Sequence, residues 1–323
     1  MVWFWIGFLL LVFILLALDL GVFNKKSHVV SAREAMRWTS VWVTLSLTFS
    51  VFVYYAYERQ WIASDMSGAQ AVLKYLTGYL VEQSLSMDNI FVIALIFAYF
   101  KVPQAYQHRV LFWGILGALF FRGVLIAFGV VLIRQFEWMT YVFGAFLLYS
   151  AYKMLDSGEN VHPTKNPAIV FMKRLFPVSK HYEGERFFVR RRHILAATPL
   201  FVALVMVETT DIMFAFDSIP AIFAITTDPF LVFTSNIFAI LGLRSLYFVL
   251  ASLLNKFRYL KYSLVIILFF VGVKLLLQHH VEFPEWLSLA VIFVSLASGI
   301  GLSLYIKQEE PAEAETQHEP VEH

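Results

Sequence analysis

Cysteine is missing from the sequence, and charged residues are scarce. None of the 323 residues is cysteine, which excludes disulfide bonds, thiolate catalysis and soft-metal sites built on thiolates. Charged residues make up 15% of the chain, whereas a soluble domain carries about 25%. So few charges cannot cover a surface that faces water, and we therefore exclude a soluble globular protein.

Hydrophobic residues take the place of the missing charges. They make up 59% of the chain, and the mean hydropathy is +0.70. A run of about 18 or more apolar residues can cross a hydrocarbon core about 30 Å thick. The sequence therefore predicts an all-α polytopic membrane protein with about nine transmembrane helices. The nine predicted helices cover residues 2–23, 38–57, 70–100, 108–133, 138–156, 195–226, 230–254, 259–278 and 285–306.

The sequence divides into six segments, which contain these helices, one long loop and a tail. The first run follows no basic region and has no small-residue cleavage site, so we expect a membrane helix rather than a signal peptide. The acidic, proline-containing end of the chain is expected to be disordered. The segments are 1–57 with two N-terminal helices, 70–156 as a first three-helix repeat, 157–193 as a basic cytosolic loop, 195–278 as a second three-helix repeat, 285–306 as the ninth helix, and the tail 307–323.

The positions of the basic residues predict the orientation. Of the 25 Lys and Arg residues, 17 fall in the odd-numbered connections between helices and 3 in the even-numbered ones. Basic residues collect on the cytoplasmic side of membrane proteins. We therefore expect the N-terminus outside and the C-terminus in the cytoplasm, in a multi-pass protein of the bacterial cytoplasmic (inner) membrane.

Two of the predicted helices carry a similar acidic pattern. The helix at 70–100 contains VEQSLSMDNI, and the helix at 195–226 contains TTDIMFAFDSI. When Asp88 is aligned with Asp217, Glu82 falls on Asp211. Each pattern is thus an acid, five further residues, a second acid, a short polar residue and Ile.

The similarity continues along the chain. Arg122 precedes Lys153 by 31 residues, and Arg244 precedes Lys274 by 30. A unit of three helices is odd in number, so two consecutive copies enter the membrane in opposite senses. The sequence therefore predicts two inverted repeats, which in transporters meet at a substrate site near the bilayer midplane.

Ionisable residues deep in a membrane helix are costly and mark functional sites by default. At a rise of 1.5 Å per residue, the opposite directions of the two helices should place Glu82 level with Asp217 and Asp88 level with Asp211. Glu208 lies one turn from Asp211 and adds a fifth carboxylate. The predicted metal ligands are Glu82, Asp88, Glu208, Asp211 and Asp217.

Neighbouring polar residues are expected to support this site. Asn89, Asn236 and Ser218 offer further oxygen atoms, while Arg122 and Arg244 are expected to pair with the acids when the site is empty. A set of oxygen ligands without Cys or His favours Mn²⁺, Mg²⁺ or Ca²⁺ over Zn²⁺ or Cu⁺. We expect no prosthetic group and no enzymatic activity, because no zinc-protease motif and no nucleophile–base pair stands out.

At these residues the sequence resembles the TerC family of membrane proteins, and particularly its Alx branch. The blocks TGYLVEQSLSMDNIF, VETTDIMFAFDSIPAIFAITTDPF and FTSNIFAILGLRSLYF carry the resemblance, which covers the second to eighth helices. The resemblance implies a manganese exporter whose acids bind the ion.

The combined interpretation is a secondary transporter that exports Mn²⁺, in exchange for protons, through a carboxylate site near the midplane. Two alternatives stay open: a Ca²⁺ or broad divalent-cation carrier, and a non-transporting membrane partner protein that helps to metalate secreted enzymes. The expected partners are a divalent cation and the lipid bilayer, with no nucleic acid. The sequence does not define ion selectivity, transport direction or oligomeric state.

Overall fold

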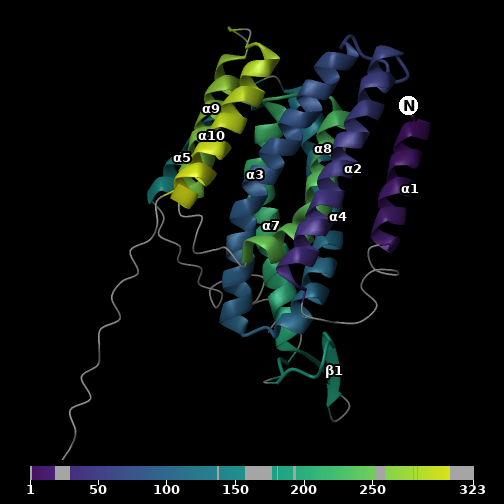
Figure 1. Cartoon of the computed structure of the whole chain (residues 1–323), viewed down its shortest axis with the longest axis vertical. Helices are drawn as coiled ribbons and strands as arrows, with labels where there is room; N and C mark the ends of the chain where they lie inside the picture. The colour runs from purple at the N-terminus through teal and green to yellow at the C-terminus, as the bar shows by residue number, and fades with distance from the viewer. Residues whose placement is uncertain are drawn as a thin grey trace, which may run out of the picture.

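The structure of the protein is a computed structural model, and it describes residues 2–18, 30–136, 138–156, 177–179, 181–191, 194–251, 259–278, 280–281 and 283–305. Within these ranges the chain forms nine helices and one two-stranded hairpin. The helices run side by side along the long axis of the molecule, and the hairpin lies at one end (Figure 1). The predicted all-α polytopic fold is confirmed, whereas residues 157–176 of the expected basic loop and the acidic tail 307–323 lie outside the described residues.

Most of the helices are long enough to cross a membrane. Of the described helices, seven are both long and apolar enough for a span, namely α2, α3, α4, α7, α8, α9 and α10. Helix α1 is a shorter apolar helix, and α5 has 18 residues. The helices are α1 (Val2–Leu18), α2 (Ala32–Glu58), α3 (Gly68–Phe100), α4 (Gln104–Gln135), α5 (Met139–Asp156), α7 (Pro199–Phe223), α8 (Pro229–Ala251), α9 (Leu260–Leu277) and α10 (Glu285–Tyr305).

The start of α7 corrects one predicted boundary. The expected helix began at residue 195, but β2 (Ile194–Ala197) pairs there in antiparallel fashion with β1 (Phe188–Arg191). Pro199 explains the difference: the residue before a proline is biased away from helical backbone, and proline itself suits the first turn of a helix. Thr198 is accordingly extended, with φ −86° and ψ 163°. The apolar run was therefore longer than the helix that it predicted.

The outer surface of the bundle is apolar. On α4 the side chains of Phe120, Val124 and Phe128 are 66%, 54% and 59% exposed. These residues are four apart and so lie on one face of the helix. A continuous exposed apolar face would be unstable in water but suits a lipid bilayer.

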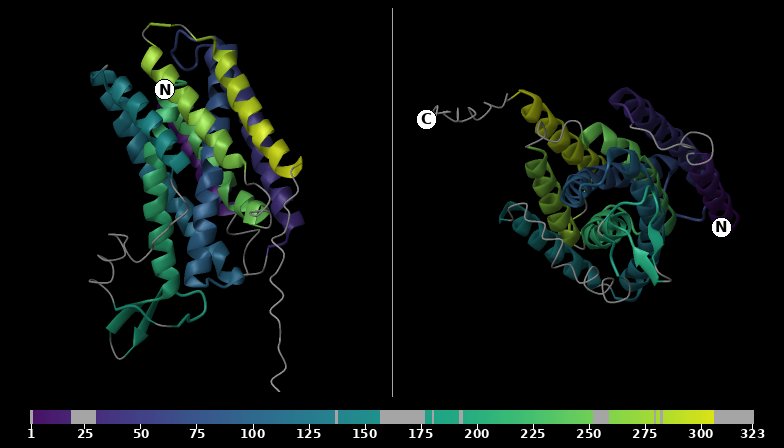
Figure 2. Two further views of the ribbon diagram at one scale, coloured as in Figure 1. Left: turned by 90° about the vertical axis from the view of Figure 1, so that its left-hand side faces the viewer. Right: turned by 90° about the horizontal axis from the view of Figure 1, so that it is seen from below.

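The helices pair in a regular manner. Helix α3 packs against α8 and α7 against α4, while α5 packs against α9. Helices α1 and α2 lie at one edge of the bundle and α5, α9 and α10 at the other (Figures 1 and 2). An inverted repeat that relates α3, α4 and α5 to α7, α8 and α9 requires this exchange of partners. The repeat itself stays a prediction.

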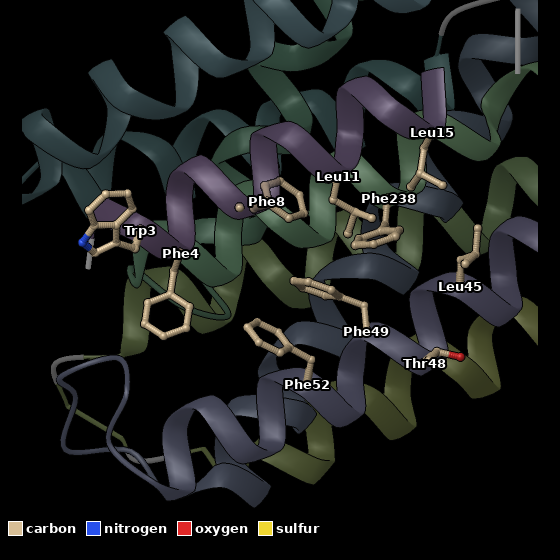
Figure 3. A pocket seen from close by; sticks show the side chains of 11 residues that line it. Trp3, Phe4, Phe8, Leu11, Leu15, Leu45, Thr48, Phe49, Phe52 and Phe238 are labelled. Carbon is tan, nitrogen blue, oxygen red and sulfur yellow. The ribbon is translucent and has the colours of Figure 1, made fainter. Parts of the chain in front are cut away.

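A groove of about 480 Å³ lies between α1 and α2. Figure 3 shows the aromatic and aliphatic side chains around it, among them Trp3, Phe8, Phe49 and Phe238. The Thr48 hydroxyl in its lining already donates to the Thr44 carbonyl at 2.8 Å. The groove therefore offers an ion no oxygen-rich site, and the candidate site must lie elsewhere.

Candidate functional site

Arg122 lies in the middle of α4 with its side chain fully buried. Its Nε donates to Asp211 Oδ2 at 3.1 Å, and its Nη2 donates to Asp211 Oδ1 at 2.8 Å. Its Nη1 donates to Glu82 Oε1 and, at 3.4 Å, to the Ser218 hydroxyl. The planar fork of one guanidinium therefore holds carboxylates from both acid-bearing helices, α3 and α7.

Each of these two carboxylates also has its own amide partner. Asn236 of α8 donates through Nδ2 to Glu82 Oε2 at 2.9 Å, and Asn89 of α3 donates through Nδ2 to Asp211 Oδ1 at 3.5 Å. We call the set of Glu82, Asn89, Arg122, Asp211, Ser218 and Asn236 the acid–amide cluster. Its six members are at most 8% exposed.

The two amides leave oxygen atoms without partners. Asn89 Oδ1 and Asn236 Oδ1 are buried, and among the described residues neither accepts a hydrogen bond. A buried polar atom without a partner costs about 1–3 kcal/mol, so such atoms call for an explanation. Amide oxygens beside carboxylates are ligands that hard divalent cations prefer.

The charge of the cluster also favours a cation. Glu82 and Asp211 carry one formal negative charge each, and Arg122 carries the single positive charge bonded to them. The remaining charge of −1 lies among buried side chains, where little water can screen it. An arriving cation would therefore be attracted.

The other predicted acids lie outside this cluster. Among the described residues, no group of three or more Asp, Glu or His side chains is placed to hold a metal ion. The Arg122 guanidinium joins Glu82 to Asp211, the first acid of each pattern. Asn89, the neighbour of Asp88, also bonds Asp211. The expected levels of the four acids stay a prediction.

Asp217 and Glu208 have separate environments. Asp217 Oδ1 accepts a hydrogen bond from Ser150 of α5 at 2.6 Å, and Lys153 of the same helix interacts with it electrostatically. The Glu208 carboxylate lies against Gly117 of α4, where a side-chain carbon would overlap it. Glu208 Oε2 is buried and accepts no hydrogen bond from the described residues. Asp88 is half-buried on α3.

Arg244 is the predicted counterpart of Arg122 and has different contacts in the structure. Its Nη1 is 3.2 Å from His108 Nε2 of α4. It follows Asn236 by eight residues on α8, which corresponds to about 12 Å along the helix axis. Asn236 is the residue of α8 whose bond to Glu82 the structure shows, and the expected pairing of Arg244 with the acids stays a prediction.

Sequence reasoning missed three contributors. Ser86 donates to Glu82 Oε1 at 3.4 Å, and its position one turn after Glu82 was a usable signal. Ser150 on α5 bonds Asp217, and Lys153 on the same helix interacts with it electrostatically. No spacing along the chain indicates that α5 lies beside this part of α7.

A bundle of long apolar helices with a lipid-compatible surface and a buried charged cluster defines an integral membrane protein that crosses the bilayer several times. The sequence pattern of the "Integral membrane protein TerC family" matches residues 67–311, and the chain belongs to this family.

Bacterial relatives cover almost the whole chain. A membrane protein of Myxococcus xanthus, described as uncharacterised, is 46% identical over 95% of this chain and 93% of its own length. A Salmonella typhi protein named "Putative membrane-bound redox modulator Alx" is 44% identical over 94% of this chain and 95% of its own length. An uncharacterised membrane protein of Rickettsia bellii is 42% identical over 94% and 97%. No solved structure matches the chain.

Proposed function

We propose that the protein is a secondary transporter that exports Mn²⁺ across the bacterial cytoplasmic membrane in exchange for protons. The observation that carries this proposal is a pair of buried amide oxygens, Asn89 Oδ1 and Asn236 Oδ1, beside the carboxylates of Glu82 and Asp211. Neither amide oxygen accepts a hydrogen bond from the described residues. Together these four side chains offer a cation both neutral and charged oxygen ligands.

The chemistry of these ligands restricts the ion. The chain has no cysteine, and every atom that the cluster offers as a metal ligand is oxygen. Such a site suits Mn²⁺, Mg²⁺ or Ca²⁺. Resemblance to the TerC family favours Mn²⁺ within this group. Carboxylates must lose their protons to bind a metal, so an ion that enters displaces protons.

The packing of the helices supports alternating access. The two acids come from α3 and α7, and each of these helices packs against a helix of the other predicted repeat. A site held between two repeats can be opened first to one side and then to the other by rocking one repeat against the other. With the N-terminus outside and the C-terminus in the cytoplasm, export runs from the side of the hairpin.

The name of the Alx relatives suggests a redox role. A modulator that acts through its own thiols needs cysteine, which this chain lacks. Under our proposal, any redox effect is indirect and follows from the cellular level of manganese.

The test is flux into vesicles that contain only the purified protein, measured for Mn²⁺, Ca²⁺ and Mg²⁺. We expect Mn²⁺ to move and Asp211→Asn to stop it. Glu185→Gln is a matched control, because Glu185 forms a part-exposed ion pair with Arg109 at 3.3 Å. Such a pair contributes about 0–1 kcal/mol. A wild-type protein that moves none of the three ions would overturn the proposal and favour the non-transporting partner protein.

A further inference from the structure

Arg122 holds the oxygen atoms that an entering ion needs. Of the four carboxylate oxygens of Glu82 and Asp211, three accept hydrogen bonds from Arg122, and the fourth accepts from Asn236. Within the acid–amide cluster, the amide oxygens of Asn89 and Asn236 accept no hydrogen bond from the described residues. A divalent ion that takes carboxylate oxygens must therefore compete with the guanidinium.

Binding the ion and the guanidinium to the same two carboxylates at once is electrostatically unfavourable. With Arg122 in place, a divalent ion changes the formal charge of the cluster from −1 to +1. If Arg122 leaves, the formal charges of the two carboxylates and one divalent ion sum to zero. Burial penalises net charge, so the neutral arrangement is favoured.

Glu208 offers the departing guanidinium a new partner. It lies three residues from Asp211 on α7, about 4.5 Å along the helix axis and on the same face. Its carboxylate lies against Gly117, which precedes Arg122 by five residues on α4. Glu208 Oε2 is buried and has no hydrogen-bond partner among the described residues. A buried acceptor of this kind destabilises the protein unless a donor binds to it.

We propose that Arg122 is a tethered cation that occupies the acid–amide cluster in the empty protein and transfers to Glu208 when a divalent ion binds. The inference rests on the proposed function, because the ion is the one that the protein carries. It assigns Glu208 the role of a positioning residue for Arg122 instead of the metal ligand that the sequence predicted. The ion then contacts Glu82, Asp211, Asn89 and Asn236.

The test is a series of Mn²⁺ binding titrations on the purified full-length protein. Replacing Arg122 removes the internal competitor, so the affinity should rise from wild type to Arg122→Lys to Arg122→Gln, by about tenfold or more at the end of the series. Glu208→Gln should weaken binding in the wild type, because the withdrawn guanidinium loses its charged partner. In the Arg122→Gln background the same change should have no further effect.

This double-mutant cycle separates the two roles of Glu208. If Glu208 were a direct ligand, Glu208→Gln would weaken binding equally in both backgrounds, which would overturn the inference. An affinity that falls from wild type to Arg122→Gln would also overturn it and assign Arg122 a purely structural role. A wild type that binds no Mn²⁺ would instead contradict the proposed function itself.

Arg122 is fully buried, and its substitution can prevent folding. A structure of the wild type with bound Mn²⁺ is the second measurement in that case. The inference expects the Arg122 guanidinium on Glu208. A Mn²⁺-bound structure in which Arg122 still donates to both oxygens of Asp211 contradicts the inference.

Discussion

Asn236 donates from Nδ2 to Glu82 Oε2 at 2.9 Å while its own Oδ1, also buried, has no partner among the described residues. The amide thus holds one ligand in place and presents another. This contact joins α8 to α3, two helices that belong to different predicted repeats. Under the proposed function, a single side chain therefore links ion binding to the interface that alternating access would rearrange.

Asn236→Ala should weaken Mn²⁺ binding by about tenfold, since it removes an oxygen ligand and releases Glu82 Oε2. The worth of a hydrogen bond to a charged group, about 1.5–3 kcal/mol, sets this magnitude. Isothermal titration of the purified protein measures it. Thr234→Val is the matched control on the same helix, because the Thr234 hydroxyl donates within α8, to the Phe230 carbonyl at 2.7 Å and the Leu231 carbonyl at 3.5 Å. Equal losses in the two variants would mean that α8 was disturbed as a whole.

Asp211→Asn should abolish Mn²⁺ export and yet leave the protein folded in the membrane. Arg122 keeps Glu82 as a charged partner, so the buried guanidinium is still compensated. The double variant Glu82→Gln with Asp211→Asn removes both partners, and loss of a buried ion pair of this kind destabilises a protein by about 3–5 kcal/mol. Membrane abundance and thermal unfolding measure the difference. A single variant as unstable as the double one contradicts the shared-arginine arrangement.

Mn²⁺ binding should release protons, and the number should be larger in Arg122→Gln than in the wild type. The wild-type cluster has one charge without a counter-ion, whereas the variant has two carboxylates and no cation to neutralise them. Metal ligands must be deprotonated, so binding should strengthen as the pH rises and level off once the acids are ionised. Titration in two buffers of different ionisation enthalpy counts the protons. An affinity that does not vary with pH in either protein would exclude proton exchange.

Gly144→Ala should lower the melting temperature, because α5 and α9 approach closely at this residue. A side-chain carbon there would lie 2.8 Å from two carbons of Leu276 and 3.1 Å from the Gly272 carbonyl oxygen. Overpacking of this kind costs about 1–3 kcal/mol. Gly301→Ala on α10 is the control, since nothing lies within 4 Å of its added carbon. A thermal-shift assay that finds the two variants alike would contradict the close packing of α5 on α9.

The helices could be predicted from the sequence because a helix that crosses a bilayer needs an apolar run of about 18 or more residues, and such runs are easily recognised. The run at 108–133 lies within α4, and the run at 285–306 matches α10 to one residue. The hairpin strand Ile194–Ala197 was missed because its apolar letters do not distinguish a strand from the first turn of a helix. Pro199 was the signal that would have moved the boundary.

The candidate site was predictable in part. The spacing between acids located Glu82 and Asp211, since charged residues inside long apolar runs are easily seen. Their pairing through Arg122 depends on how deeply α3, α4 and α7 lie relative to one another, which spacing along one helix does not define. The repeat suggested equal roles for Arg122 and Arg244. The bond from Asn236 to Glu82, and the contact of Arg244 with His108, depend on how α8 packs, which the repeat does not define.

Hydrogen bonds around the hairpin fix the start of α7. Thr198 begins α7 and is bonded to the hairpin, since its hydroxyl donates to the Arg186 carbonyl at 2.7 Å and its amide to the Phe187 carbonyl at 2.9 Å. Tyr182, just before the hairpin, donates to the Phe100 carbonyl at the end of α3 at 2.6 Å. The start of α7 is thus tied to the end of α3. If α7 tilts as a rigid rod about Thr198, Asp217 sweeps through a wider arc than Asp211, because it lies farther along the helix.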